Sequence, residues 1–205
     1  MTYDALKIAV FVSGRGSNLN AILDYPKLKN LAEVKAVVSD KFDCPAFEIA
    51  RKNDIPVYKV GKKEGFITYE KLKDILVSMD IGLIVLAGFL KLIPAVILST
   101  FRNRIINIHP ALLPSFGGSG MFGMNVHQKV FDSTTQVSGA TVHFVDETFD
   151  TGKIILQRCV DITNVNSPEE IAERVLKIEH QLLPEAIEKI ASGKVRIINN
   201  RVHLN

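Results

Sequence analysis

Cysteines, long apolar runs and clustered basic residues are all scarce in this 205-residue chain. Its two cysteines, Cys44 and Cys159, lie far apart and belong to no closely spaced metal or redox motif, so reduced thiols are expected. The longest near-continuous apolar run, at 81–90, is too short to cross a bilayer. No secretory signal is visible at the N-terminus. We therefore expect a cytoplasmic protein with no membrane partner.

The net charge of +3 is too small to predict a nucleic-acid partner, because the lysines are scattered and no basic run is interleaved with aromatic residues. Hydrophobic residues make up 47% of the chain and charged residues 23%, which is typical of a globular protein. The length fits one large domain over residues 1–205 with a substantial core. The oligomeric state stays open between a monomer and a homodimer.

The first half of the chain alternates short apolar runs with helical patterns. The apolar runs, typical of parallel strands buried on both faces, lie at 8–12, 34–38, 55–60, 82–87 and 104–108. The helical patterns between them lie at 17–24, 44–53, 68–79 and 94–101. This alternation predicts an α/β fold: a Rossmann-like, mostly parallel twisted sheet with helices on both faces.

The second half follows a different pattern. A loop rich in proline and glycine at 110–125 leads into a short helix at 126–131. Strands at 139–145 and 153–160 then predict an antiparallel hairpin, with 146–152 as its long tip.

A long C-terminal helix is expected to begin at Ser167. Ser167 and Glu170 form a capping box, and Pro168 suits the first helical position. Pro184 should kink or interrupt this helix, and Gly193 is a suitable stop. Two short strand-like runs follow, at 195–198 and 201–204.

The strand at 104–108 leads into two polar side chains and a proline. Asn107 and His109 are two residues apart, so they project to the same face of the strand. Ligands bind at the carboxyl ends of parallel strands, and an amide beside an imidazole suits a reaction that builds negative charge on an oxygen. The alternative is a structural histidine in front of a proline, Pro110, that only ends the strand.

A glycine loop follows the first predicted strand. Gly16 permits a tight turn, and Ser17 and Asn18 can donate hydrogen bonds or cap the next helix. Asp40 lies where a dinucleotide fold places its ribose-binding acid, but Leu19 replaces the third glycine of that fingerprint. The loop therefore favours a single phosphate over a dinucleotide; an ordinary turn that binds nothing is the alternative.

The predicted hairpin tip carries three acids, of which Asp146 and Glu147 suit a solvated tip. Asp150 stands before Thr-Gly and is the better partner for His109. A carboxylate beside an imidazole favours its charged form, and a modest rise from a pKa of ~6.5 would keep His109 protonated at neutral pH.

Three other features have less specific patterns. The segment 86–94 could line a slot for a flat ring, although core packing explains it equally well. Glu179 lies beside the apolar stripe of the long helix and could instead form a surface salt bridge. His127, His143 and His203 show no metal-ligand spacing, and no catalytic role is expected for them.

Four segments in this order resemble the phosphoribosylglycinamide formyltransferase family, within the wider group of enzymes that use formyltetrahydrofolate. They are the glycine loop at 13–18, Leu-Ala-Gly-Phe at 86–89, Asn-Ile-His-Pro-Ala-Leu-Leu-Pro at 107–114 and the segment 143–152. The resemblance covers nearly the whole chain, from Lys7 to about Gly193.

The resemblance implies transfer of a formyl group from 10-formyltetrahydrofolate, as co-substrate, to the amine of glycinamide ribonucleotide in purine biosynthesis, with no metal. It implies a phosphate-binding half at about 1–100 and a folate and catalytic half at about 101–205. The implied ribonucleotide contacts are Gly16, Ser17, Asn18 and Glu179. The implied folate contacts are Leu90, Lys91, Leu92, Ile93, Asn107, Val145, Asp146 and Asp150. The implied catalytic residues are Asn107, His109 and Asp150.

In the mechanism that this resemblance implies, the free amine, with a pKa near ~8, attacks the formyl carbon directly. Asn107 and protonated His109 stabilise the oxyanion, and Asp150 orients His109 and can relay the amine proton to N10 through water. Two departures stand out: the loop at 116–123 is long, and Phe66 occupies the place of a basic folate contact, which Lys62 or Lys63 could replace.

Three alternatives remain open at this point: a formyltetrahydrofolate hydrolase, another formylfolate-dependent transferase such as methionyl-tRNA formyltransferase, and a dinucleotide-binding sensor protein on the same fold.

Overall fold

The computed structural model describes residues 4–205 and divides the chain into two compact units, Met1–Asn107 and Ile108–Asn205. The boundary falls inside strand β5 (Ile105–His109). Cys44 is buried and Cys159 is exposed, and both are free thiols. Within residues 4–205, no helix is both long enough and apolar enough to span a membrane.

The first unit contains a parallel sheet in the order β3-β2-β1-β4-β5. Its strands before β5 are β1 (Leu6–Val12), β2 (Ala32–Ser39), β3 (Val57–Lys59) and β4 (Leu83–Leu86). The apolar run of β1 is completely buried in the middle of this sheet, as a strand covered on both faces requires. The edge strand β3 is shorter than predicted, because Pro56 has no N–H with which to extend the ladder.

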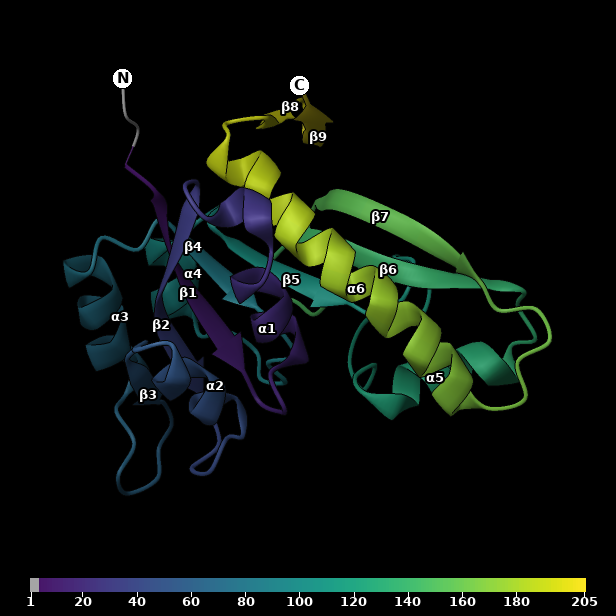
Figure 1. The fold of residues 1–205 in the computed structure, drawn as a ribbon, viewed down its shortest axis with the longest axis horizontal. Coiled ribbons are helices and arrows are strands. Elements are labelled where there is room, and N and C mark those ends of the chain that lie inside the picture. Colours follow the sequence, from purple (N-terminus) through teal and green to yellow (C-terminus); the bar gives the residue numbers. More distant parts are fainter. Residues whose placement is uncertain (1–3) are drawn as a thin grey trace. The chain divides into compact units, whose positions relative to one another are not determined.

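Four α-helices cover this sheet: α1 (Ser17–Leu23), α2 (Ala46–Lys52), α3 (Tyr69–Ser78) and α4 (Ala95–Thr100). A short 3₁₀ turn, η1 (Pro26–Leu28), follows α1. The strand order reverses direction beside β1, so right-handed crossovers place α1 and α2 on one face and α3 and α4 on the other. Accordingly, α1 packs beside α2 and α3 beside α4 (Figure 1). The prediction of helices on both faces is confirmed.

The second unit contains the predicted antiparallel hairpin, β6 (Val137–Phe144) and β7 (Ile154–Asp161). The long helix α6 (Pro168–Ala191) lies across both strands, and α5 (Met124–Asp132) packs against α6 (Figure 1). The final strands, β8 (Val195–Ile198) and β9 (Arg201–Leu204), pair with each other in an antiparallel ladder.

Helix α6 begins as predicted, but the expected interruption at Pro184 is wrong. Ser167 Oγ accepts a hydrogen bond from the Glu170 N–H, and a Glu170 carboxylate oxygen accepts one from the Asn166 N–H. The helix continues through Pro184, which is buried with its neighbours Leu182 and Leu183. Burial of this apolar stripe outweighs the one backbone hydrogen bond that proline cannot donate.

Candidate active site

A histidine and a carboxylate meet inside the second unit. His109 is the last residue of β5, and Asp150 lies in the loop that joins β6 to β7. His109 Nδ1 lies 3.5 Å from Asp150 Oδ2, and the two side chains are only 4% and 8% exposed. The structure therefore brings together, away from bulk water, two of the three side chains implied as catalytic.

Backbone contacts fix the tautomer of His109. Its Nε2 lies 2.8 Å from the carbonyl oxygen of Phe116, which can only accept a hydrogen bond. Nε2 therefore carries a hydrogen, and Nδ1, which faces Asp150, is the nitrogen that can gain or lose a proton. Phe116 belongs to the long glycine loop, so one function of that loop is to orient the imidazole.

The predicted rise in the pKa of His109 is wrong. Burial lowers the pKa of His109, and this outweighs the rise that Asp150 and the Phe116 carbonyl cause. The neighbouring carboxylate can be inferred from the sequence, whereas the loss of water around the ring cannot. His109 Nδ1 thus faces the carboxylate of Asp150, while burial holds the pKa of the ring below its usual value.

Asp150 remains ionised despite its burial. Burial alone would raise its pKa, but contacts with His143, His109 and the Gly118 N–H together hold the pKa below its usual value. The Gly118 N–H donates to Asp150 Oδ2 over 2.9 Å, which is a second contact from the long glycine loop. The buried pair thus consists of an ionised carboxylate and an imidazole whose pKa is lowered by burial.

The loop that carries Asp150 is folded tightly onto the end of β6. Asp150 has a left-handed backbone with φ of +59°, a conformation that aspartate tolerates better than most residues. A Cβ at Gly152 would clash with the carbonyl oxygen of Phe144, so only glycine permits this close approach. The Phe144 N–H closes the loop by donating to the Lys153 carbonyl over 2.8 Å.

His143 is a site residue that the sequence reasoning missed. It lies next to the end of β6 with a 2% exposed side chain, and its Nε2 is 3.6 Å from Asp150 Oδ1. A buried histidine at the end of the strand that leads into the Asp150 loop is the signal that could have identified it. His127 on α5 is also buried; burial and, to a smaller extent, His109 lower its pKa.

Polar contacts hold the segment after His109 in place. Thr141 Oγ1, on β6, donates to the Ala111 carbonyl over 2.6 Å and accepts from the Leu113 N–H over 3.1 Å. Gln157 Nε2, on β7, donates to the Leu113 carbonyl over 2.8 Å. Asn107 is half-buried on β5, two residues before His109.

The predicted phosphate loop lies between β1 and α1 in the first unit. Gly16 precedes α1 with φ of +81°, and a Cβ there would lie 2.7 Å from the Cβ of Ala46 on α2. The Ala46 N–H donates to the Gly14 carbonyl over 3.3 Å, so α2 supports the loop from behind. Ser17 and Asn18 are the first two residues of α1, and neither caps the helix.

Asp40, considered above as a ribose-binding acid, is already engaged. Its Oδ1 accepts a hydrogen bond from Ser13 Oγ over 2.5 Å, and its side chain is 8% exposed. Ser13 Oγ in turn accepts from the Leu90 N–H over 3.2 Å. Ser13 of the glycine loop therefore links Asp40 to the predicted folate segment within the first unit.

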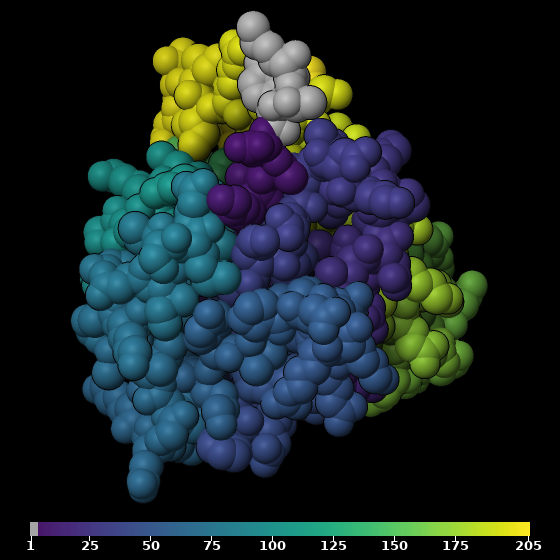
Figure 2. Space-filling view, turned by 60° about the vertical axis from the view of Figure 1, so that its left-hand side comes forward, coloured from purple at the N-terminus to yellow at the C-terminus, as the bar shows by residue number. Residues whose placement is uncertain are grey.

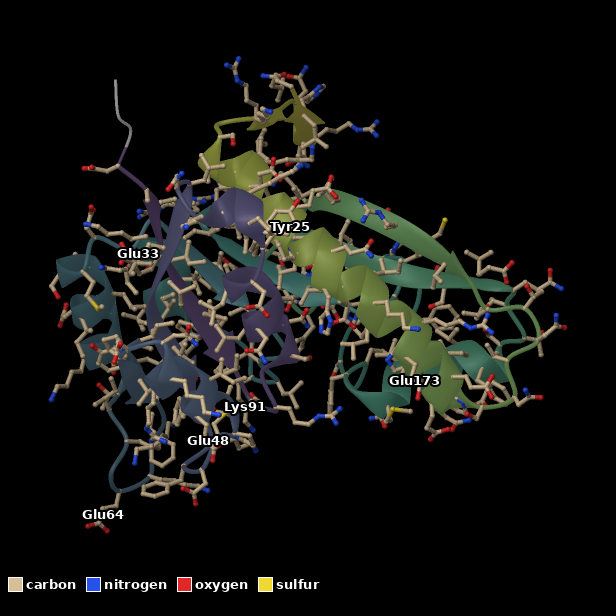
Figure 3. All side chains as sticks on the ribbon, viewed as in Figure 1. Tyr25, Glu33, Glu48, Glu64, Lys91 and Glu173 are labelled. Carbon is tan, nitrogen blue, oxygen red and sulfur yellow. The ribbon has the colours of Figure 1, made fainter. Side chains whose placement is uncertain are left out.

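A cavity of about 730 Å³ extends along this unit from the predicted folate segment. It is lined by Asp40, Lys41, Phe42, Val60, Gly61, Lys62, Lys63, Glu64, Phe66, Tyr69, Lys91 and Leu92. Figure 2 shows the face of the unit formed by residues 40–70, drawn in blue. In Figure 3 Glu64 marks the tip of the loop after β3, and Lys91 lies nearer the strands. The lining is thus mainly aromatic and basic.

The remaining predicted contacts occupy varied surroundings. Leu90 is largely exposed, whereas Ile93 is buried. Val145 is half-buried at the start of the Asp150 loop. Asp146 is exposed, and its Oδ1 accepts from Thr151 Oγ1 over 2.7 Å, so it stabilises the loop. Glu179 is half-buried on α6.

This chain belongs to the formyl transferase family, whose sequence model matches residues 6–187. The predicted family is therefore confirmed.

Within that family the chain is similar to phosphoribosylglycinamide formyltransferases. It is 42% identical to the chloroplastic enzyme of Vigna unguiculata over 193 residues, which cover 92% of this chain and 62% of the relative. It is also 42% identical to the chloroplastic enzyme of Arabidopsis thaliana over 195 residues, covering 93% of this chain and 67% of the relative. The chain thus spans about two thirds of the length of these relatives.

Solved structures give the same family and the same fold. Phosphoribosylglycinamide formyltransferase from Anaplasma phagocytophilum superposes with a TM-score of 0.89 at 30% identity, covering 98% of this chain and 95% of the other. A formyltetrahydrofolate deformylase from Pseudomonas syringae superposes with a TM-score of 0.86 at 21% identity, covering 99% of this chain and 67% of the other. The second likeness shows the fold alone, so this fold does not separate transfer from hydrolysis.

Proposed function

We propose that this enzyme transfers the formyl group of 10-formyltetrahydrofolate to the amine of glycinamide ribonucleotide in purine biosynthesis. The relatives and the solved structure named for this activity support the acceptor. The observation that carries the chemistry is the buried pair of Asp150 and His109, with Nδ1 directed toward the carboxylate. A cytoplasmic location stays a prediction, since the plant relatives are chloroplastic.

In the reaction that we propose, His109 carries a proton from the attacking amine to N10 of the donor. The glycinamide amine attacks the formyl carbon, and the new C–N bond forms as the carbonyl electrons move onto oxygen. His109 Nδ1 accepts the proton that the attacking nitrogen loses, so the ring becomes an imidazolium beside Asp150. Asn107 donates to the oxyanion. Nδ1 then returns the proton to N10 as the C–N10 bond breaks, which releases tetrahydrofolate.

We assign the ribonucleotide contacts from the family resemblance. Gly16, Ser17 and Asn18 hold the phosphate, because the N–H groups at the start of α1 have no partner within the helix. The support of this loop by Ala46 keeps these groups in place before the substrate arrives. Glu179 contacts the ribose.

The folate donor is assigned to the segment Leu90, Lys91, Leu92 and Ile93, together with Asn107, Val145, Asp146 and Asp150. Both Lys62 and Lys63 line the same cavity as Lys91 and Leu92, and Phe66 lines it beside them. Either lysine can therefore supply the positive charge that Phe66 lacks. We assign the carboxylates of the donor's acidic tail as the group that this lysine binds.

An assay of ribonucleotide dependence tests this proposal. Purified enzyme with 10-formyltetrahydrofolate should release tetrahydrofolate only when glycinamide ribonucleotide is present. Equal release without the ribonucleotide would support hydrolysis, the reaction of the deformylase that shares this fold. Turnover with formylatable tRNA but not with the ribonucleotide would support another formylfolate-dependent transferase.

A further inference from the structure

The two carboxylate oxygens of Asp150 have different partners. Oδ2 lies 3.5 Å from His109 Nδ1 and accepts from the Gly118 N–H over 2.9 Å. Oδ1 lies 3.6 Å from His143 Nε2. The carboxylate thus lies between two buried imidazoles, and the proposed reaction uses only one of them.

His143 lies on a strand, whereas Asp150 lies in a loop. Its Nδ1 donates to the Phe144 carbonyl over 2.8 Å, which fixes the ring on β6 with Nε2 toward the carboxylate. Asp150, in contrast, belongs to a loop in which residues 146–149 are exposed, and it has a left-handed backbone. The contact therefore joins the loop carboxylate to a strand whose position is set by its pairing with β7.

We propose that His143 is a positioning residue, which anchors Oδ1 of Asp150 to β6 and so directs Oδ2 toward His109. The expected effect on turnover rests on the proposed function, whereas the contact between His143 and Asp150 does not depend on it. His143 contacts neither of the reacting atoms in this assignment, and it acts through Asp150. Two titratable groups on the surrounding elements, His109 of β5 and His143 of β6, lower the pKa of Asp150. A third, His127 of α5, has its own pKa lowered by His109.

Substitutions that differ in reach separate positioning from simple packing. In H143Q the amide nitrogen can take the place of Nε2 and donate to Oδ1. In H143N the amide is too short to reach Oδ1, and in H143L no polar contact remains. The control is V142A, because Val142 is the fully buried neighbour on β6 and offers no polar group.

We expect H143L and H143N to lower kcat about tenfold or more, with KM for both substrates changed by less than about twofold. H143Q should restore kcat to within about threefold of the wild type. The contact with His143 lowers the pKa of Asp150 and, to a smaller extent, that of His109, so its loss should also move the acid limb of the kcat profile to higher pH. V142A should lose stability and keep the wild-type acid limb. If H143L fails to fold, the H143N and H143Q pair gives the same comparison.

A titration that needs no turnover separates this inference from the proposed function. The 13C chemical shift of the Asp150 carboxyl, followed against pH in the unliganded protein, should titrate at higher pH in H143N than in the wild type, H143Q and V142A. Equal titration in all four proteins, with equal kcat, would overturn the positioning role. The wild-type protein could lack ribonucleotide-dependent transfer while H143N still titrates at higher pH than the wild type. That pair of results would support the positioning role and refute the proposed function.

Discussion

Replacing Asp150 with asparagine should remove the charge of the catalytic pair with little change in its shape. In D150N the amide oxygen can still accept from the Gly118 N–H, and the amide group keeps the planar shape of the carboxylate. The variant should therefore fold. What it loses is the attraction between the carboxylate and the imidazolium that forms when His109 accepts the amine proton.

The size of this loss follows from the 3.5 Å separation between His109 Nδ1 and Asp150 Oδ2. With an effective dielectric constant of about 20, two unit charges at that distance attract by roughly 5 kcal/mol. Both side chains are less than one tenth exposed, so solvent screens little of this attraction. Since about 1.4 kcal/mol corresponds to a factor of ten, we expect kcat to fall on the order of 10³-fold.

Formyl transfer by D150N should be measured over pH 5–9 beside the wild type and E147Q. Glu147 is an exposed acid of the same loop, so E147Q controls for the general loss of a negative charge. The pKa of His109 should fall further in D150N, because Asp150 is the main influence that raises it. A kcat within tenfold of the wild type in a folded D150N protein would refute the charge-stabilisation argument.

Three further predictions concern the donor site, the hairpin loop and the effect of pH. The K62A/K63A double variant should raise KM for a polyglutamylated donor about tenfold with kcat unchanged in steady-state assays; an unchanged KM would refute the assignment. G152A should lower the free energy of unfolding by about 2 kcal/mol or more in urea, because its Cβ would clash with a strand carbonyl; wild-type stability would contradict this. Burial lowers the pKa of His109 and His127, so the unfolded chain binds more protons and urea stability should fall as pH drops from 7 to 5; a rise over that interval would contradict these directions.

The periodic parts of the fold could be predicted because burial and pairing leave a pattern in the sequence. The run at 8–12 is apolar at every position because β1 is covered on both faces. The boundaries of α6 follow from Ser167, Glu170 and Gly193, each of which has a local backbone function. Pro184 was misjudged because its tolerance depends on the packing of the whole helix, which no local pattern reports.

The candidate site could be predicted only in part. Asn107 and His109 are two residues apart on one strand, so their shared face follows from strand geometry. The charge of His109 depends on how completely its ring is buried, and that depends on the path of the glycine loop. The contact of His143 with Asp150 requires a left-handed turn at the hairpin tip, which the sequence does not specify.

The fate of a labelled formyl group tests the central claim most directly. With 13C-formyl 10-formyltetrahydrofolate and glycinamide ribonucleotide, the account predicts that the label appears in formylglycinamide ribonucleotide in equal amount to the tetrahydrofolate released. Recovery of the label as free formate, at the same rate with and without the ribonucleotide, would contradict it.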